Sequence, residues 1–292
     1  MSERHVGLLG ATSLMGECLL KQLLENDWQI TAFSRHPITQ SHPQITWQQL
    51  DTTNQLRIST DKNSIALWLC VAPIWILPEY FDLLLAYGAQ RIVVLSSTSR
   101  FTKNTSSSPN EREIVQQLIK GEEIVQTWAA THGVKWIILR PTLIYGYGRD
   151  KNVAEIARFI RRFRFFPLCG PAKGLRQPVH VEDVASACYV ALGALNLTNR
   201  SYNLTGREAL AYREMINRVF AALNLPPRML TIPLWFFQIA AWGLSWLPRY
   251  RYWTSAMAER MNQDLKFDCS DAKRDLNFSP RSFKLTAEDL PG

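Results

Sequence analysis

The chain has 292 residues, of which 47% are hydrophobic, and it carries 33 Lys and Arg against 25 Asp and Glu. This composition is typical of a folded globular protein and excludes an intrinsically disordered chain. The length suits one large domain with a smaller lobe. The formal net charge of +8 favours anionic partners, such as nucleotides or an acidic lipid surface, without choosing among them.

The cysteines predict neither a disulfide framework nor a zinc site. They form no C-x-x-C pair and have no histidine cluster near them; they are Cys18, Cys70, Cys169, Cys188 and Cys269. The first apolar run begins a few residues after Met1, which leaves no room for a signal peptide. We therefore expect a reducing, cytoplasmic location and no metal.

The segment from Val6 to Gly16 predicts a strand, a tight glycine turn and a helix. The apolar run turns at Gly10 and continues into leucines at helical spacing. In a Rossmann unit the first glycine allows the turn, a small middle residue admits a pyrophosphate, and the last glycine packs the helix against the strand. We predict a phosphate site here, with a plain turn as the alternative. The expected cofactor residues are Gly7, Gly10, Thr12, Ser13, Leu14, Met15 and Gly16.

Residues 9–16, L-G-A-T-S-L-M-G, resemble the T-G-A-T-G-F-I-G loop of the extended and atypical short-chain dehydrogenases/reductases. Ser13 stands where that family has its middle glycine. The resemblance implies a doubly wound parallel Rossmann sheet, an α/β fold, with a smaller carboxyl-terminal mixed α/β lobe for the substrate. We expect residues 1–199 to bind NAD(P), and residues 200–292, joined by residues 152–166, to form the lobe.

Residues 29–34 predict the second strand, and Ser34 and Arg35 at its end favour NADP over NAD. An acidic residue there would bind ribose hydroxyls and repel a phosphate, whereas a hydroxyl and a guanidinium suit a 2′-phosphate. An ordinary solvated loop cation is the alternative for Arg35. After a third predicted strand, residues 45–50, Asp51 either contacts the adenine, as the resemblance implies, or caps the following helix.

Residues 65–71 are a continuous apolar run, as expected of a strand that is buried on both faces of a parallel sheet. Ala72 and Pro73 end this run. By the resemblance they would form a wall of the cofactor site. A proline that merely terminates the strand is the alternative.

Residues 91–95 predict the fifth strand, and the serines and threonine after it match the family's S-S-[ST] signature. The carboxyl ends of strands are where open α/β sheets bind ligands. The resemblance places Ser96 and Ser97 beside the cofactor and gives Thr98 the position of the catalytic hydroxyl.

The next predicted helix, residues 111–132, departs from the family pattern. In the superfamily a Y-x-x-x-K pair puts a proton-transferring tyrosine one turn from a lysine that lowers the phenol pKa and binds the nicotinamide ribose. Lys120 aligns with that lysine, but Gln116 stands at the tyrosine position, and glutamine is neither acid nor base near neutral pH. Either Tyr145 or Tyr147 substitutes, or Gln116 only orients a carbonyl, or the protein binds cofactor without catalysis.

Residues 134–139 predict the sixth strand, and the R-P-T-L-I-Y-G run after it matches the family's R-P-x-x-[IV]-Y-G motif. The resemblance places Pro141 and Thr142 in the wall around the nicotinamide. A strand end that only ties loops together is the alternative. Residues 177–185, Q-P-V-H-V-E-D-V-A, match a further family segment, in which we expect Asp183 to cap a helix rather than bind a metal.

Two segments outside these motifs carry distinctive surfaces. Residues 152–166 predict an amphipathic helix with one face rich in arginine. This face is either simply solvated, or it binds a substrate diphosphate or acidic lipid headgroups. No nucleic-acid-binding module accompanies it, so we expect no nucleic-acid partner. Residues 231–248 carry no charge and three tryptophans, and are too short to cross a bilayer as a helix. They either pack on the lobe or lie at a membrane interface, for which 233–251 is the candidate segment.

Together the patterns predict an NADP-dependent, epimerase- or dehydratase-like oxidoreductase acting on a small alcohol, carbonyl or nucleotide-sugar-type substrate. Thr98 and Lys120 would be its surviving active-site groups. The alternative is a cofactor-binding regulatory or assembly protein without catalysis, in one form attached peripherally to a membrane.

Overall fold

The computed structural model of the protein describes residues 4–39, 41–50, 64–102, 106–233 and 255–292. Asp51 lies outside these ranges, and so do residues 234–248 of the uncharged segment with three tryptophans. The strands of the central sheet are β1 (His5–Leu9), β2 (Gln29–Ser34), β3 (Ile45–Gln49), β4 (Leu67–Cys70), β5 (Arg91–Leu95), β6 (Lys135–Pro141) and β11 (Arg200–Leu204).

The central sheet is parallel throughout and has seven strands in the order β11-β6-β5-β4-β1-β2-β3. From β1 the chain winds outward through β2 to β3, and then returns to place β4 on the other side of β1. The strand order therefore reverses between β1 and β4, which is the switch point where doubly wound sheets bind ligands. The predicted doubly wound α/β fold is confirmed.

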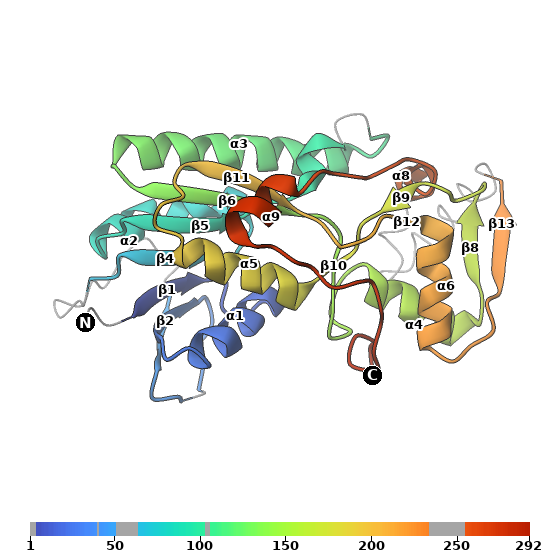
Figure 1. Cartoon of the computed structure of the whole chain (residues 1–292), viewed down its shortest axis with the longest axis horizontal. Helices are drawn as coiled ribbons and strands as arrows, with labels where there is room; N and C mark the ends of the chain where they lie inside the picture. The colour runs from blue at the N-terminus through green and yellow to red at the C-terminus, as the bar shows by residue number, and fades with distance from the viewer. Residues whose placement is uncertain (1–3, 40, 51–63, 103–105, 234–254) are drawn as a thin grey trace.

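Helices cover both faces of this sheet (Figure 1). One face packs against α1 (Leu14–Leu24), α5 (Val181–Gly193) and α9 (Ser270–Leu276), and the other against η1 (Ile74–Tyr80), α2 (Phe81–Ala86) and α3 (Pro109–Thr131). Strand side chains alternate between the two cores, since Leu8 packs in the first and Leu9 in the second. This double burial explains the apolar runs in the central strands β4 and β5.

A third core forms a lobe beside the carboxyl ends of the strands. Its main elements are α4 (Val153–Phe163), β8 (Phe166–Cys169), α6 (Tyr212–Ala222), β13 (Met229–Ile232) and α8 (Ser255–Arg260). Short strand pairs join β7 (Ile144–Tyr145) to β10 (Val179–His180), and β9 (Leu175–Arg176) to β12 (Leu210–Ala211). Across the described ranges, no helix is both long and apolar enough to pass through a membrane.

The division between the two parts differs from the one expected at residue 200. Residues 152–166 do pack in the lobe core through α4, but β11 is an edge strand of the central sheet and pairs with β6. Helix α9 also returns to the sheet, where Ala272 and Leu276 are buried in the first core. β11 therefore covers the outer edge of β6, and α9 packs on one face of the sheet.

Candidate functional site

The loop between β1 and α1 is shaped by two glycines and a serine. Gly10 has φ +88°, and a Cβ there would lie 2.6 Å from the backbone nitrogen of Ala72. A Cβ on Gly16 would lie 2.2 Å from the carbonyl oxygen of Gly10. Ser13 caps α1: its hydroxyl donates to the Gly10 carbonyl (2.7 Å) and accepts from the Gly16 N–H (3.0 Å). Serine therefore replaces the family's middle glycine while stabilising the same turn.

The residues present at this loop fit the pyrophosphate of a dinucleotide. Thr12 and Ser13 are exposed, and the N–H groups of Leu14 and Met15 belong to the first turn of α1, which has no intrahelical acceptors for them. The positive end of the helix dipole adds to the attraction for an anion. Gly7 lies lower in β1, where a Cβ would meet the Trp68 ring at 2.5 Å, so its role is packing.

The ends of the two strands beside β1 flank this loop. Ser34 is buried, and its hydroxyl accepts the backbone N–H of His36 (3.2 Å). Arg35 is exposed at the end of β2, where it is available to an anion. On the other side, Ala72 is half-buried against Gly10, and Pro73 is the capping position of η1.

The S-S-T run after β5 divides between the protein interior and a cavity. The Ser96 hydroxyl is buried and donates to Glu122 (2.6 Å). Ser97 caps η2 (Thr98–Phe101) by accepting a backbone N–H. Thr98 is 4% exposed and donates to the carbonyl of Pro141 (3.2 Å). Ser97 and Thr98 line the cavity, whereas Ser96 anchors the run from behind.

The face of α3 that packs toward the sheet and the cavity is not the face that carries Gln116 and Lys120. Glu111 lines the cavity, and Val115, Leu118 and Glu122 follow it at helical spacing, all three buried. Glu122 accepts hydrogen bonds from the guanidinium of Arg140, with the closest contact at 2.5 Å. This buried ion pair fixes the rotation of α3.

Gln116 and Lys120 lie outside the buried face of α3. Both are exposed, and neither lines the cavity. The resemblance gave them the positions of the tyrosine and the lysine, and these two positions are rotated away from Glu122. The side chains on the buried face at Val115 and Leu118 are apolar.

The two candidate replacement tyrosines also lie away from Thr98. Tyr145 is 1% exposed in the lobe core, edge-on to His180 and Phe283, and burial raises the pKa of its phenol above the usual range. Tyr147 donates its hydroxyl to Glu182 at a second cavity of about 360 Å³. Burial, followed by this hydrogen bond, raises the pKa of Tyr147.

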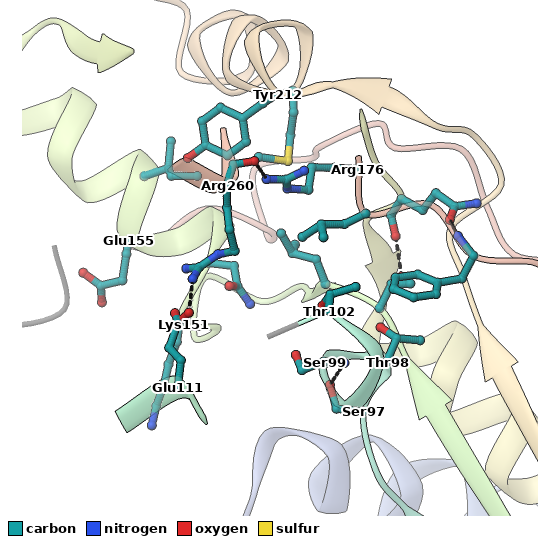
Figure 2. Close-up of a pocket in the computed structure, with 18 residues that line it drawn as sticks. Ser97, Thr98, Ser99, Thr102, Glu111, Lys151, Glu155, Arg176, Tyr212 and Arg260 are labelled. Atoms are coloured by element: carbon teal, nitrogen blue, oxygen red, sulfur yellow. Dashed lines mark hydrogen bonds and ion pairs between the residues drawn. The ribbon is translucent and has the colours of Figure 1, made fainter. Parts of the chain in front are cut away.

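The main cavity has a volume of about 700 Å³ and lies between the sheet and the lobe (Figure 2). Thr98 and its neighbours from η2 lie on one side, and Tyr212 and Arg260 from the lobe lie on the other (Figure 2). Thr142 also lines it and donates its hydroxyl to the Gln177 carbonyl. The lining further includes Ser99, Thr102, Glu111, Leu143, Lys151, Asn152, Glu155, Ile156, Arg176, Met215, Leu265 and Phe267.

Two arginines in this lining were not singled out by the sequence analysis. Arg176 is 5% exposed, donates to the backbone carbonyls of Leu175 and Gln263 (2.7 and 2.8 Å), and lies over the Tyr212 ring. Burial lowers the pKa of Arg176 to about 10. Within the described ranges no carboxylate forms an ion pair with it. Arg260, in contrast, pairs with Glu111.

A signal for Arg176 was present in the sequence, since it directly precedes the matched Q-P-V-H-V-E-D segment. In that segment His180, not Asp183, caps α5, which begins at Val181. His180 accepts the Glu182 N–H at Nδ1 (3.2 Å), and its Nε2 lies 3.0 Å from Asp289. Asp183 accepts hydrogen bonds from the backbone and side chain of Arg281 instead.

Comparison with known proteins finds similarity to one family model and to several proteins. Residues 79–205 match the model of the NAD dependent epimerase/dehydratase family, which is the kind of family that the sequence motifs predicted. An uncharacterized protein of Sinorhizobium fredii, y4nG, is 27% identical, aligned over 93% of this chain and 74% of that protein. UDP-glucose 4-epimerase of Vibrio cholerae is 21% identical, aligned over 58% of this chain and 51% of that protein.

Solved structures share the fold over almost the whole chain. MoeE5 in complex with UDP-glucose and NAD has a TM-score of 0.68 and 18% identity, covering 95% of this chain and 94% of that one. The UDP-N-acetylglucosamine 4-epimerase of Bacillus cereus has a TM-score of 0.67 and 19% identity, covering 95% and 91%. At this identity the likeness shows the fold, including the lobe that follows the sheet.

Proposed function

We propose that the protein binds a nicotinamide dinucleotide, NADP in preference to NAD, and oxidises or reduces an alcohol or carbonyl compound. The match of residues 79–205 to the model of the NAD dependent epimerase/dehydratase family supports this proposal. One observation carries this proposal. The Gly10 turn and Thr98 both lie at the carboxyl edge of one parallel sheet, and the 700 Å³ cavity adjoins Thr98.

The cofactor-binding role falls to the loop residues already described. The N–H groups of Leu14 and Met15 and the hydroxyl of Thr12 would hold the pyrophosphate. Arg35 would hold a 2′-phosphate, since a guanidinium binds phosphate through paired hydrogen bonds and no acidic residue stands beside it in residues 36–39. The nicotinamide, when bound, supplies hydride chemistry.

The substrate that we propose is anionic, of nucleotide-sugar type. Arg176 is a buried cation in the cavity lining without a carboxylate partner among the described residues, and such a cation is most stable beside an anion. Lys151 adds a second positive charge to the lining. Proteins of the same fold have been solved with UDP-glucose and UDP-glucuronic acid, which are anionic sugars of this kind.

The proton-handling role has to differ from the family pattern. We assign it to Glu111, the titratable side chain that α3 contributes to the cavity, with Thr98 orienting the substrate oxygen. A carboxylate oxygen can accept a hydrogen bond from a substrate hydroxyl, which is the geometry that proton transfer requires. The ion pair with Arg260 holds this carboxylate in position.

A second candidate function is favoured by the apolar face of α3. Val115 and Leu118 occupy that face where the family pattern would require titratable groups, which suits a protein that binds the cofactor for regulation or assembly without turnover. The two candidates share the cofactor site and differ only in whether Glu111 and Thr98 take part in chemistry.

The first experiment is a fluorescence titration of the full chain with NADPH and with NADH, using its ten tryptophans as energy donors. We expect NADPH to bind more tightly. Replacing Arg35 with Asp should weaken NADPH binding about 10- to 100-fold, the value of a charge-assisted hydrogen bond, and spare NADH. The matched control is Lys273→Glu, an exposed cation on α9. Binding of neither nucleotide would overturn the proposed function.

The second experiment separates the two candidates by assaying UDP-glucose and UDP-glucuronic acid with NADP. If the protein is an enzyme, Glu111→Gln and Thr98→Val should each lower kcat by about 100-fold or more. Gln116→Ala and Lys120→Ala, both on the exposed side of α3, should leave kcat unchanged. Tight NADPH binding without turnover would support the second candidate, and loss of activity in the Lys120 variant alone would overturn the role of Glu111.

A further inference from the structure

The end of the lobe formed by the last turn of α4 and the starts of β8 and β13 lies far from the amino terminus (Figure 1). Arg162 and Arg164 are exposed there on either side of Phe163. The backbone N–H of Phe166 donates to the carbonyl of Arg228 (2.9 Å), which brings the chain before β13 beside the end of α4. Arg228 is also exposed.

This end of the lobe is positively charged, and the sequence stretches that form it contain no acidic residues. The sequence has no Asp or Glu between Glu155 and Glu182, nor between Glu214 and Glu259. These two stretches supply α4 after its first turn, β8, the end of α6 and β13. In the part of the chain that the structure describes, no carboxylate pairs with Arg162, Arg164 or Arg228.

Apolar side chains are exposed among these cations. Leu230 is 53% exposed on β13, and Phe163 is 39% exposed at the end of α4. The Arg162 guanidinium lies 5.9 Å from the centre of the Phe163 ring, so charge and apolar surface are adjacent. A surface of this kind suits a bilayer interface, where cations meet anionic headgroups and apolar side chains enter the acyl boundary.

We propose that this lobe end, Arg162, Phe163, Arg164, Arg228 and Leu230, docks peripherally on an anionic lipid bilayer. Charge complementarity selects this partner, since the cations have no competing carboxylates near them in the sequence. A nucleic acid would use the same arginines but would gain little from Leu230, an exposed aliphatic side chain. None of these five residues lines the main cavity.

The test is co-sedimentation of the full chain with vesicles of phosphatidylglycerol and phosphatidylcholine, and with vesicles of phosphatidylcholine alone. We expect binding to the anionic vesicles only, falling as salt is raised. The variant with Arg162, Arg164 and Arg228 all changed to Glu should bind at least about 100-fold more weakly, since each cation near an anionic surface contributes about fivefold. Leu230→Ser should weaken binding without changing its salt dependence.

Lys273→Glu is the matched control, because it reverses one exposed charge on α9 and should leave binding within about fivefold. Circular dichroism and NADPH titration establish that each variant is folded. Failure of the wild-type chain to bind anionic vesicles, or equal binding by the triple variant, would overturn the proposal. Binding of random-sequence DNA that depends on the three arginines but not on Leu230, with no vesicle binding, would replace it with a nucleic-acid surface.

Discussion

Glu122 and Arg140 form a buried ion pair that sets which side of α3 meets the sheet. The Arg140 Nη2 lies 2.5 Å from one carboxylate oxygen of Glu122, and its Nε lies 3.0 and 3.1 Å from the two oxygens. Ser96 and Arg100 donate to the same carboxylate. Because Arg140 lies near the end of β6 and Ser96 follows β5, the Glu122 side chain ties α3 to the ends of two strands.

Replacing Glu122 with Gln should destabilise the protein strongly. The change leaves Arg140 buried without a carboxylate, which costs about 3 kcal/mol or more of unfolding free energy. Urea unfolding followed by circular dichroism measures this loss of unfolding free energy. The control is Glu123→Gln, which is next in sequence but exposed, and should change the free energy by less than about 0.5 kcal/mol. Equal losses in the two variants would contradict the anchoring role of Glu122.

Replacing Gly16 with Ala should abolish NADPH binding and lower stability. Its Cβ would lie 2.2 Å from the Gly10 carbonyl oxygen, so the loop and α1 have to separate. The comparison variant is Gly193→Ala, at the end of α5, where a Cβ would have no heavy atom within 4 Å. We expect that change to be neutral or to stabilise by up to about 1 kcal/mol. Thermal unfolding and NADPH titration report both effects.

Asp289 should make the carboxyl-terminal segment sensitive to acid. Burial raises the pKa of Asp289, but hydrogen bonds from His180 and Thr286 outweigh that effect and hold the pKa below its ordinary value. A carboxyl whose pKa is lower in the folded state stabilises the fold above its unfolded pKa, about 3.9, and this stability is lost as pH falls through the folded pKa.

The variant Asp289→Asn should therefore lose about 1–3 kcal/mol of unfolding free energy at pH 7. Its stability should also fall less steeply than that of the wild type as the pH is lowered below about 4. Urea unfolding measured from pH 7 down to below about pH 4 gives both the loss of unfolding free energy and its dependence on pH. Glu288→Gln, an exposed neighbour, serves as the control, and identical acid profiles for wild type and Asp289→Asn would refute the assignment.

The sequence was sufficient to predict most of the sheet and the strand, turn and helix of residues 6–16. The predicted strands at residues 29–34 and 91–95 coincide with β2 and β5. For β5 the reason is a continuous apolar run, as expected of a strand buried on both faces. The positive φ of Gly10 is a local property of the turn and favours glycine. The close contact with the backbone of Ala72, in contrast, forms only when β4 pairs with β1.

The cavity was harder to predict because its residues come from distant segments. The rotation of α3 depends on Arg140, which lies in the next strand, so the alignment of Lys120 with the family's lysine could not show which way this residue faces. Arg176 and Arg260 meet only after the lobe has folded. The local sequence pattern predicts a helix and its apolar face. Which element packs against each face depends on the tertiary fold.

The interleaving of the sheet and the lobe bears on how the protein folds. The chain leaves the sheet after β6, returns for α5 and β11, enters the lobe again through α6, and comes back as α9. A ribosome that has released only the first 199 residues has therefore not yet supplied β11, the outer partner of β6. The sheet and the lobe must therefore consolidate together, late in synthesis. Fragments cut at residue 199 should not fold as independent units.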